Sequence, residues 1–170
     1  MPKFSVRVVD RTKKHPREAR LARVFCEHIL KTLVKTREFA ALSSFYELAV
    51  GIILVSPAES RSLNRRFRKR RYTPDVLTFP VFDNWNAVKK VQSPSIDLGD
   101  IVICPRAVLQ GAAKSEKSFY AQFFWTITHG ILHGVGFDHE RGAGERRRME
   151  RLEERILENL SILLPKQKAH

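Results

Sequence analysis

The 170-residue chain has only two cysteines and no long apolar run, and these absences exclude several classes of protein. Cys26 and Cys104 are too few for a disulfide framework or a four-cysteine zinc site. No stretch of about 18 apolar residues is available to span a membrane, and the first residues alternate in polarity where a secretory signal would be apolar. We therefore expect a soluble, cytoplasmic protein with reduced cysteines.

Acidic residues are also scarce, because 18 Asp and Glu stand against 31 Lys and Arg and give a formal net charge of +13. Such an excess attracts polyanions over long distances and releases counterions when it neutralises phosphates. Nucleic acid is therefore the expected partner. A membrane surface is disfavoured, since the densest basic run, Arg65 to Arg71, carries little of the apolar surface that a peripheral helix inserts into lipid.

Short strand patterns alternate with longer helical patterns along the chain. The length suits one domain spanning residues 1–170. Period-two or β-branched patterns predict strands over residues 4–9, 46–55, 76–81 and 100–104. Helical patterns with proline or N-cap signals are found from Pro16 onwards, over 56–67, from Pro105 onwards, and over 115–137 and 144–164. The polar segment 83–97 is expected to be a loop.

The predicted helix 115–137 is apolar around most of its circumference, which indicates a central, buried position. His129 and His133 lie four residues apart on it, so their side chains share one face and can reach one ion. Gly136 follows, and glycine beyond a helix end permits a turn that would bring His139 back to the same face. Three neutral imidazoles leave one tetrahedral position of zinc open for a water molecule, whose pKa then falls to about 7. The histidines therefore predict a catalytic metal site.

The spacing from His129 to His139 matches the His-x3-His-x2-Gly-x2-His frame of metzincin proteases, except that Gly130 stands at the position of their catalytic glutamate. Without that glutamate the water lacks its usual general base, which argues against ordinary proteolysis. Asp138 and Glu140 border the last histidine. Either carboxylate could accept a proton, orient an imidazole or be a solvated turn residue, so the sequence leaves the general base open.

Three separated segments, Leu63–Pro80, Gly99–Cys104 and His129–His139, together resemble the YbeY family of rRNA-maturation endoribonucleases. The resemblance spans most of residues 56–140. It implies an α+β fold with one mixed sheet of about four strands flanked by helices, in which a zincin-like central helix carries the metal ligands. It also implies one zinc ion on the three histidines and cleavage of single-stranded RNA during ribosomal RNA maturation and ribosome quality control.

The resemblance also implies roles for the basic run. An arginine that ends the Leu-Asn-x-x-aromatic-Arg block of the family faces the metal cleft, and the matching residue is Arg68, which would neutralise charge developing on a phosphoryl oxygen. Its basic neighbours would hold the RNA backbone without reading its sequence; they are Arg65, Arg66, Lys69, Arg70 and Arg71. Ribosomal small subunits or assembly factors are the implied further partners.

The chain departs from the usual family pattern at three positions. Gly134, Phe137 and Thr78 stand where the family usually has Leu, Tyr and Ser. Two other functions stay open at this point. One is a zinc peptidase that recruits its base from elsewhere, and the other is a non-catalytic RNA-binding assembly factor in which the metal only braces the fold. Whether water or the 2′-hydroxyl of the RNA attacks the phosphate is equally open.

Overall fold

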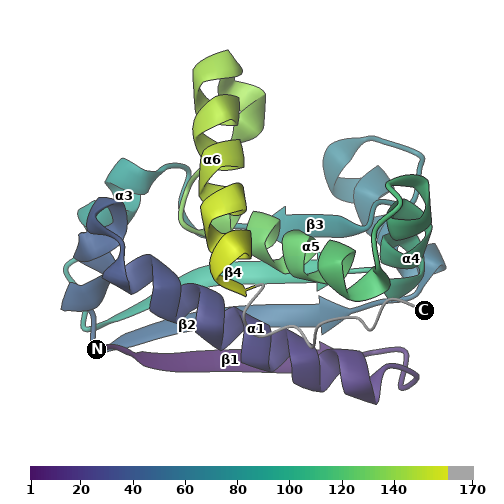
Figure 1. Ribbon diagram of the computed structural model, residues 1–170, viewed down its shortest axis with the longest axis horizontal. Helices are drawn as coiled ribbons and strands as arrows, with labels where there is room; N and C mark the ends of the chain where they lie inside the picture. The colour runs from purple at the N-terminus through teal and green to yellow at the C-terminus, as the bar shows by residue number, and fades with distance from the viewer. Residues whose placement is uncertain (161–170) are drawn as a thin grey trace.

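Four strands form one mixed sheet in the computed structural model, which describes residues 1–160 (Figure 1). The strands are β1 (Lys3–Asp10), β2 (Glu47–Leu54), β3 (Val76–Phe79) and β4 (Ser95–Ile103). Their spatial order is β1-β2-β4-β3, with β1, β2 and β4 parallel and the edge strand β3 antiparallel to β4. The mixed sheet of four strands that the resemblance implies is therefore confirmed.

Helices connect the strands and also follow the last of them, β4. They are α1 (Pro16–Lys35), α2 (Pro57–Leu63), α3 (Trp85–Lys89), α4 (Pro105–Lys114), α5 (Phe119–Gly134) and α6 (Ala143–Leu160), with shorter turns η1 (Arg37–Ser44), η2 (Asn64–Arg68) and η3 (His139–Arg141). Proline occupies the first turn of α1, α2 and α4, where its missing N–H has no partner to lose. Within residues 1–160, none of the helices is long and apolar enough to cross a bilayer.

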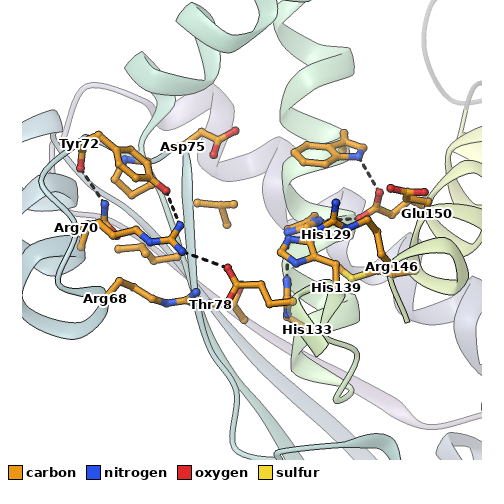
Figure 2. A pocket seen from close by; sticks show the side chains of 18 residues that line it. Arg68, Arg70, Tyr72, Asp75, Thr78, His129, His133, His139, Arg146 and Glu150 are labelled. Carbon is orange, nitrogen blue, oxygen red and sulfur yellow. Dashed lines mark hydrogen bonds and ion pairs between the residues drawn. The ribbon is translucent and has the colours of Figure 1, made fainter. Parts of the chain in front are cut away.

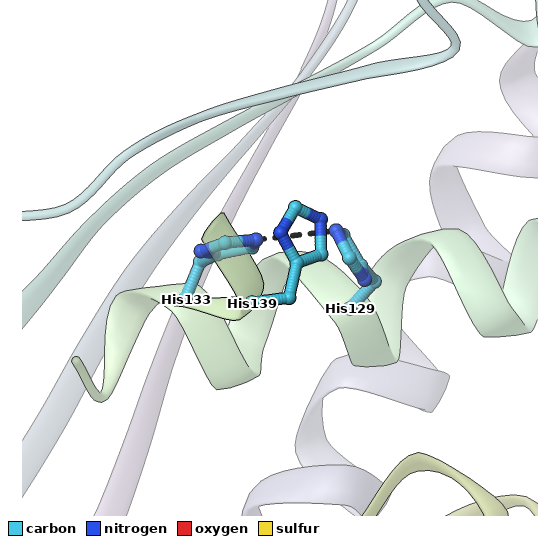
Figure 3. A group of neighbouring side chains, drawn as sticks. All are labelled: His129, His133 and His139. Atoms are coloured by element: carbon cyan, nitrogen blue, oxygen red, sulfur yellow. Dashed lines mark hydrogen bonds between the residues drawn. The ribbon is translucent and has the colours of Figure 1, made fainter. Parts of the chain in front are cut away.

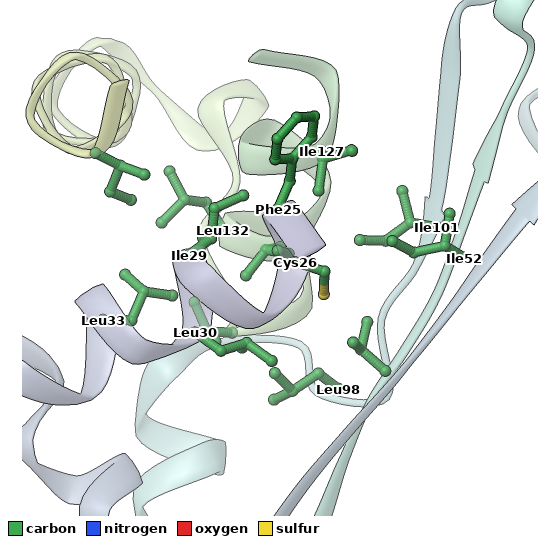
Figure 4. Close-up of a cluster of buried hydrophobic side chains, with 14 of the residues drawn as sticks. Phe25, Cys26, Ile29, Leu30, Leu33, Ile52, Leu98, Ile101, Ile127 and Leu132 are labelled. Atoms are coloured by element: carbon green, nitrogen blue, oxygen red, sulfur yellow. The ribbon is translucent and has the colours of Figure 1, made fainter. Parts of the chain in front are cut away.

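The hydrophobic core lies between the sheet and the two helices α1 and α5 (Figures 1 and 4). Phe25 and Ile29 of α1 and Ile127 of α5 are buried above Ile52 of β2 and Ile101 of β4. Helix α5 also contacts α6, so the sheet, α1 and α6 together surround it. This enclosure explains why its sequence is apolar on most sides, and it confirms the predicted central helix.

The two cysteines belong to different apolar clusters. Cys26 lies in the main core on α1, whereas Cys104 belongs to a smaller cluster with Leu77, Val102 and Ala107. Both are buried and free, and burial raises the pKa of the Cys26 thiol above its usual value. Their burial in apolar clusters agrees with the structural role that was predicted for them.

The segment 83–97, predicted to be a loop, contains regular structure. Helix α3 forms because the side chain of Asn84 caps it by accepting a hydrogen bond from the Ala87 amide at 3.0 Å. Strand β4 begins at Ser95, five residues before the predicted start. Ile96 and Leu98 are buried while the alternate residues are exposed, so the strand has one covered and one uncovered face in this part.

Both ends of helix α5 also differ from the prediction. Helix α5 starts at Phe119, because Ser118 acts as its N-cap, and it ends at Gly134, before the expected Phe137. Helix α6 was expected to continue to Leu164. Leu163 and Leu164 lie outside the described residues.

Candidate metal centre and cleft

Helix α5 presents two of the three predicted ligands on one face. His129 is buried and His133 is partly buried one turn later, and their Nε2 atoms are 3.2 Å apart. Two nitrogens bound at about 2.05 Å to a common tetrahedral ion would lie about 3.3 Å apart. The observed separation therefore matches two ligands of one metal ion.

A Schellman turn at the end of α5 returns the chain toward these histidines. The amide of Phe137 donates to the Leu132 carbonyl at 3.0 Å, and that of Gly136 donates to the His133 carbonyl at 2.9 Å. Gly136 has a φ of +92°, in the left-handed region, as the motif requires. A β-carbon at Gly136 would also come within 2.5 Å of the Trp85 amide nitrogen. Glycine is thus required here for both conformation and space, as the sequence predicts for the turn.

His139 then lies beside the other two imidazoles (Figure 3). One nitrogen from each of His129, His133 and His139 lies within 4.8 Å of the others. The Nδ1 atom of His139 is buried and has no hydrogen-bond partner among the described residues. Burial and the two neighbouring imidazoles lower the pKa of His133 from 6.5 to about 4, with a smaller effect from Arg68. His133 is therefore neutral at physiological pH, which a metal ligand must be, and the three residues fit a metal ion.

Behind His129 lies a residue that the sequence prediction missed. Glu153 on α6 is buried, and its Oε1 lies 2.7 Å from Nδ1 of His129. Its other oxygen, Oε2, accepts a hydrogen bond from the Trp125 indole N–H at 3.1 Å. The available signal was a charge on the apolar stripe of α6, because Glu153 follows Leu152 and precedes Ile156 among its buried residues.

A cleft of about 440 Å³ opens in front of the histidines (Figure 2). One wall comes from the segment between α2 and β3 and contains Arg68, Arg70 and Tyr72. The opposite wall comes from α6 and contains Arg146 and Glu150. Each wall therefore carries arginine side chains that face the other wall across the metal centre, and these could contact the phosphates of a nucleic-acid strand lying between them.

The structure divides the predicted RNA-binding residues into two groups. Arg68 and Arg70 line the cleft, but the other four basic residues of the run are exposed outside its lining: Arg65, Arg66, Lys69 and Arg71. The division follows from η2, whose five residues form a π-helical turn that ends at Arg68 and is followed by Lys69 in the left-handed conformation. Tyr72 and Arg146 were not predicted, since nothing in their local sequence distinguishes them.

Both carboxylates beside His139, those of Asp138 and Glu140, have interaction partners. Asp138 caps η3 by accepting a hydrogen bond from the Glu140 amide at 2.9 Å, and it pairs with Arg141 at 3.6 Å. Glu140 pairs with Arg70 across the mouth of the cleft at 3.6 Å (Figure 2). Asp138 therefore stabilises the turn that carries His139, whereas Glu140 links η3 to the wall that contains Arg70.

Gly130, which occupies the position of the metzincin glutamate, faces the sheet. A β-carbon added there would lie 2.6 Å from Cγ2 of Ile101 on β4, closer than real side chains approach. The helix sits so near the sheet that this position holds no side chain. A glutamate base cannot project from it into the cleft.

Comparisons with known proteins agree with this arrangement. A family profile described as "Endoribonuclease YbeY" matches residues 8–161. Among curated proteins with that name, the one from Thermodesulfovibrio yellowstonii is 34% identical over 113 residues, which are 66% of this chain and 67% of the relative. The one from Alkalilimnicola ehrlichii is 38% identical over 117 residues, 69% of this chain and 68% of the relative.

A solved structure is similar in fold. The solution structure of TM1509 from Thermotoga maritima superposes with a TM-score of 0.61 and covers 97% of this chain and 99% of its own. The two sequences are 23% identical. The similarity therefore concerns the arrangement of the sheet and helices.

Proposed function

The chain belongs to the YbeY family of endoribonucleases, and we propose that it cleaves single-stranded RNA during ribosomal RNA maturation and ribosome quality control, using one zinc ion held by His129, His133 and His139. The convergence of three imidazoles at the floor of an arginine-walled cleft carries this proposal. Neutral imidazole donors suit zinc, and three of them leave a coordination position for substrate or water.

The side chains of the cleft have separate tasks in this mechanism. Arg70 and Arg146 hold the RNA backbone from opposite walls, and the exposed residues Arg65, Arg66, Lys69 and Arg71 extend this contact along the strand. Arg68 lies close enough for its charge to lower the pKa of His133, and it stabilises negative charge on the phosphoryl oxygens. A bound zinc ion supplies Lewis acidity toward a phosphoryl oxygen and lowers the pKa of water.

Arg70 reaches RNA by exchanging partners. Both side chains of its ion pair with Glu140 are exposed, and such pairs contribute little to the free energy of folding. A phosphodiester oxygen can therefore replace the carboxylate at small cost. This exchange would also move Glu140 away from the mouth of the cleft and admit the strand.

The decisive experiment compares substrates with and without the metal. We expect the zinc-loaded protein to cut single-stranded ribosomal RNA and to leave casein intact, and we expect activity to disappear on chelation and in the His133→Ala variant. If casein were cleaved and the RNA stayed intact, the zinc-peptidase hypothesis would replace this proposal. RNA binding that persists in His133→Ala, with no turnover in either form, would instead establish a non-catalytic assembly factor.

We also propose that the protein works in the cytoplasm on ribosomal small subunits or with their assembly factors, because ribosomal RNA is the proposed substrate. Sedimentation of a tagged form through a sucrose gradient tests this. The protein is expected to migrate with small-subunit precursors, and migration only as free protein would argue against the partner.

A further inference from the structure

A buried carboxylate without a basic side chain stands behind the metal centre. Glu153 is 7% exposed, and within residues 1–158 its only ion pair is with His129. No Lys or Arg neutralises it there. An isolated buried carboxylate is strongly unfavourable unless a positive charge lies close by. The three-histidine site, on the other side of the His129 ring, is a place where a bound cation would supply such a charge.

The contacts of Glu153 fix how His129 is held. Each carboxylate oxygen has its own donor, since Oε1 contacts Nδ1 of His129 and Oε2 accepts from Trp125. Trp125 also stacks on the His129 ring, with ring centres 4.8 Å apart and planes inclined by 29°. The imidazole is thus held at its edge by a hydrogen bond and on its face by an indole.

These contacts determine which nitrogen is free. A carboxylate acceptor at Nδ1 requires the proton on Nδ1, and that leaves the lone pair of Nε2 available. Nε2 is the atom that lies 3.2 Å from Nε2 of His133. The tautomer imposed by Glu153 is therefore the one in which His129 presents its lone pair toward the shared metal position.

From this geometry we propose that Glu153, anchored by Trp125, is the positioning residue of the metal centre: it selects the ligating tautomer of His129 and supplies the negative charge that a bound cation balances. The inference rests on the proposed function, because it requires a metal at the three histidines. It also connects α6 to the metal centre, since Glu153 lies on α6 and its carboxylate is hydrogen-bonded to a ligand.

Metal affinity provides the test. Glu153→Gln keeps the shape but leaves one acceptor oxygen for two donors, so either Trp125 or His129 faces an amide N–H. We expect the affinity for Zn²⁺, measured by competition with a chromogenic chelator, to fall by about 10- to 100-fold. The absorption spectrum of the Co²⁺ form should change as well. The matched control is Glu154→Gln, which removes the same charge from the exposed neighbour and should leave both measurements unchanged.

A second variant separates positioning from structural support. In Trp125→Phe/Glu153→Gln the competing indole donor is gone, so the single amide oxygen can accept from His129, and zinc affinity should recover in part relative to Glu153→Gln. Far-UV circular dichroism of the metal-free variants reports folding. If Glu153→Gln fails to fold, the double variant is compared directly with the wild type and should bind zinc within about tenfold of it.

The outcomes distinguish this inference from the proposed function. Absence of zinc binding in the wild type would overturn both. Zinc binding in the wild type that stays equal in folded Glu153→Gln, or a double variant that binds more weakly than Glu153→Gln, would overturn the positioning role and leave the proposed function intact.

Discussion

At the scale of single residues, the two arginines of one cleft wall are in different electrostatic situations. Arg70 pairs with Glu140 and donates a long hydrogen bond, 3.5 Å, to the Tyr72 hydroxyl. The side chain of Arg68 makes no ion pair or hydrogen bond with the described residues, yet it contributes to the lowered pKa of His133. Of these two arginines, we therefore expect Arg68 to be the one that can receive a phosphate without first losing a partner.

Substitution of Arg68 should affect turnover and spare the metal. In Arg68→Ala we expect the single-turnover rate of RNA cleavage to fall by about 10²- to 10³-fold, as when a donor to a developing oxyanion is removed. Arg68→Lys should recover only part of the rate, because a lysine lacks the planar fork. Zinc content, measured on the same samples, should equal that of the wild type. A wild-type rate in Arg68→Ala would contradict the assigned role.

Tyr72 directly follows the basic run Arg65 to Arg71, and its ring is available for stacking on a base. Phe67 is similarly exposed, but its ring forms a T-shaped contact with Phe79, with ring centres 5.0 Å apart, and it does not line the cleft. Tyr72 lines the cleft and is 53% exposed. An unpaired base that stacks on it would contribute about 1–3 kcal/mol of binding free energy, and such stacking is possible only for single strands.

Two substitutions at Tyr72 test this contact. Tyr72→Ala should weaken binding of a fluorescent single-stranded RNA by about 5- to 150-fold, as measured by anisotropy, whereas Tyr72→Phe should retain it. The control is Tyr46→Ala, which removes a tyrosine that is 71% exposed outside the cleft. Equal affinities for the Tyr72→Ala and Tyr46→Ala variants would exclude the stacking contact.

At the scale of elements, the helix that carries the ligands approaches the sheet through glycines. Gly130 and Gly134 follow the two histidines by one residue each and share their four-residue spacing. A β-carbon at Gly130 would meet Ile101 at 2.6 Å, and one at Gly134 would meet the Leu98 carbonyl at 3.0 Å. The close contact of Gly130 and Gly134 with the sheet therefore fixes how α5 is oriented and where its two histidines point.

This close contact predicts that a methyl group added at Gly130 destabilises the protein. Gly130→Ala should lower the free energy of unfolding by about 1–3 kcal/mol, because the added group overpacks the contact between α5 and β4. Urea denaturation measures the difference. Gly144→Ala is the matched control, since no atom lies within 4 Å of its β-carbon position in α6 and alanine favours a helix. Equal stability of the Gly130→Ala variant and the wild type would show that the helix can move away from the sheet.

The sequence predicted elements whose signals are local and missed those whose signals are spatial. Proline and cap residues located the starts of α1, α2 and α4, and the four-residue spacing paired His129 with His133. The start of β4 was missed because Ser95 and Asp97 face the uncovered side of the sheet, so its polar half resembles a loop. Glu153 was missed because its importance depends on α6 packing beside α5, which brings it to His129, 24 residues away in sequence.

At the scale of the whole molecule, the net charge of +13 is not spread evenly over the functional surface. The cleft lining contains Arg68, Arg70 and Arg146 but also acidic side chains: Asp75, Glu140, Glu150 and Glu153. The cleft is thus locally mixed, and much of the positive charge lies on surfaces away from the metal. Long-range attraction and specific phosphate contacts are consequently separable, because only the second depends on where an arginine is placed.

The dependence of RNA binding on salt distinguishes the two contributions. For single strands the slope of log K against log salt concentration changes by about 0.7 for each phosphate contact. Arg70→Gln should therefore make the slope shallower by about 0.7. Arg20→Gln removes the same charge from an exposed position on α1 outside the cleft and should leave the slope unchanged. Equal shifts in both variants, measured by titrating a single-stranded RNA at several salt concentrations, would mean that net charge alone attracts the RNA and that Arg70 makes no phosphate contact.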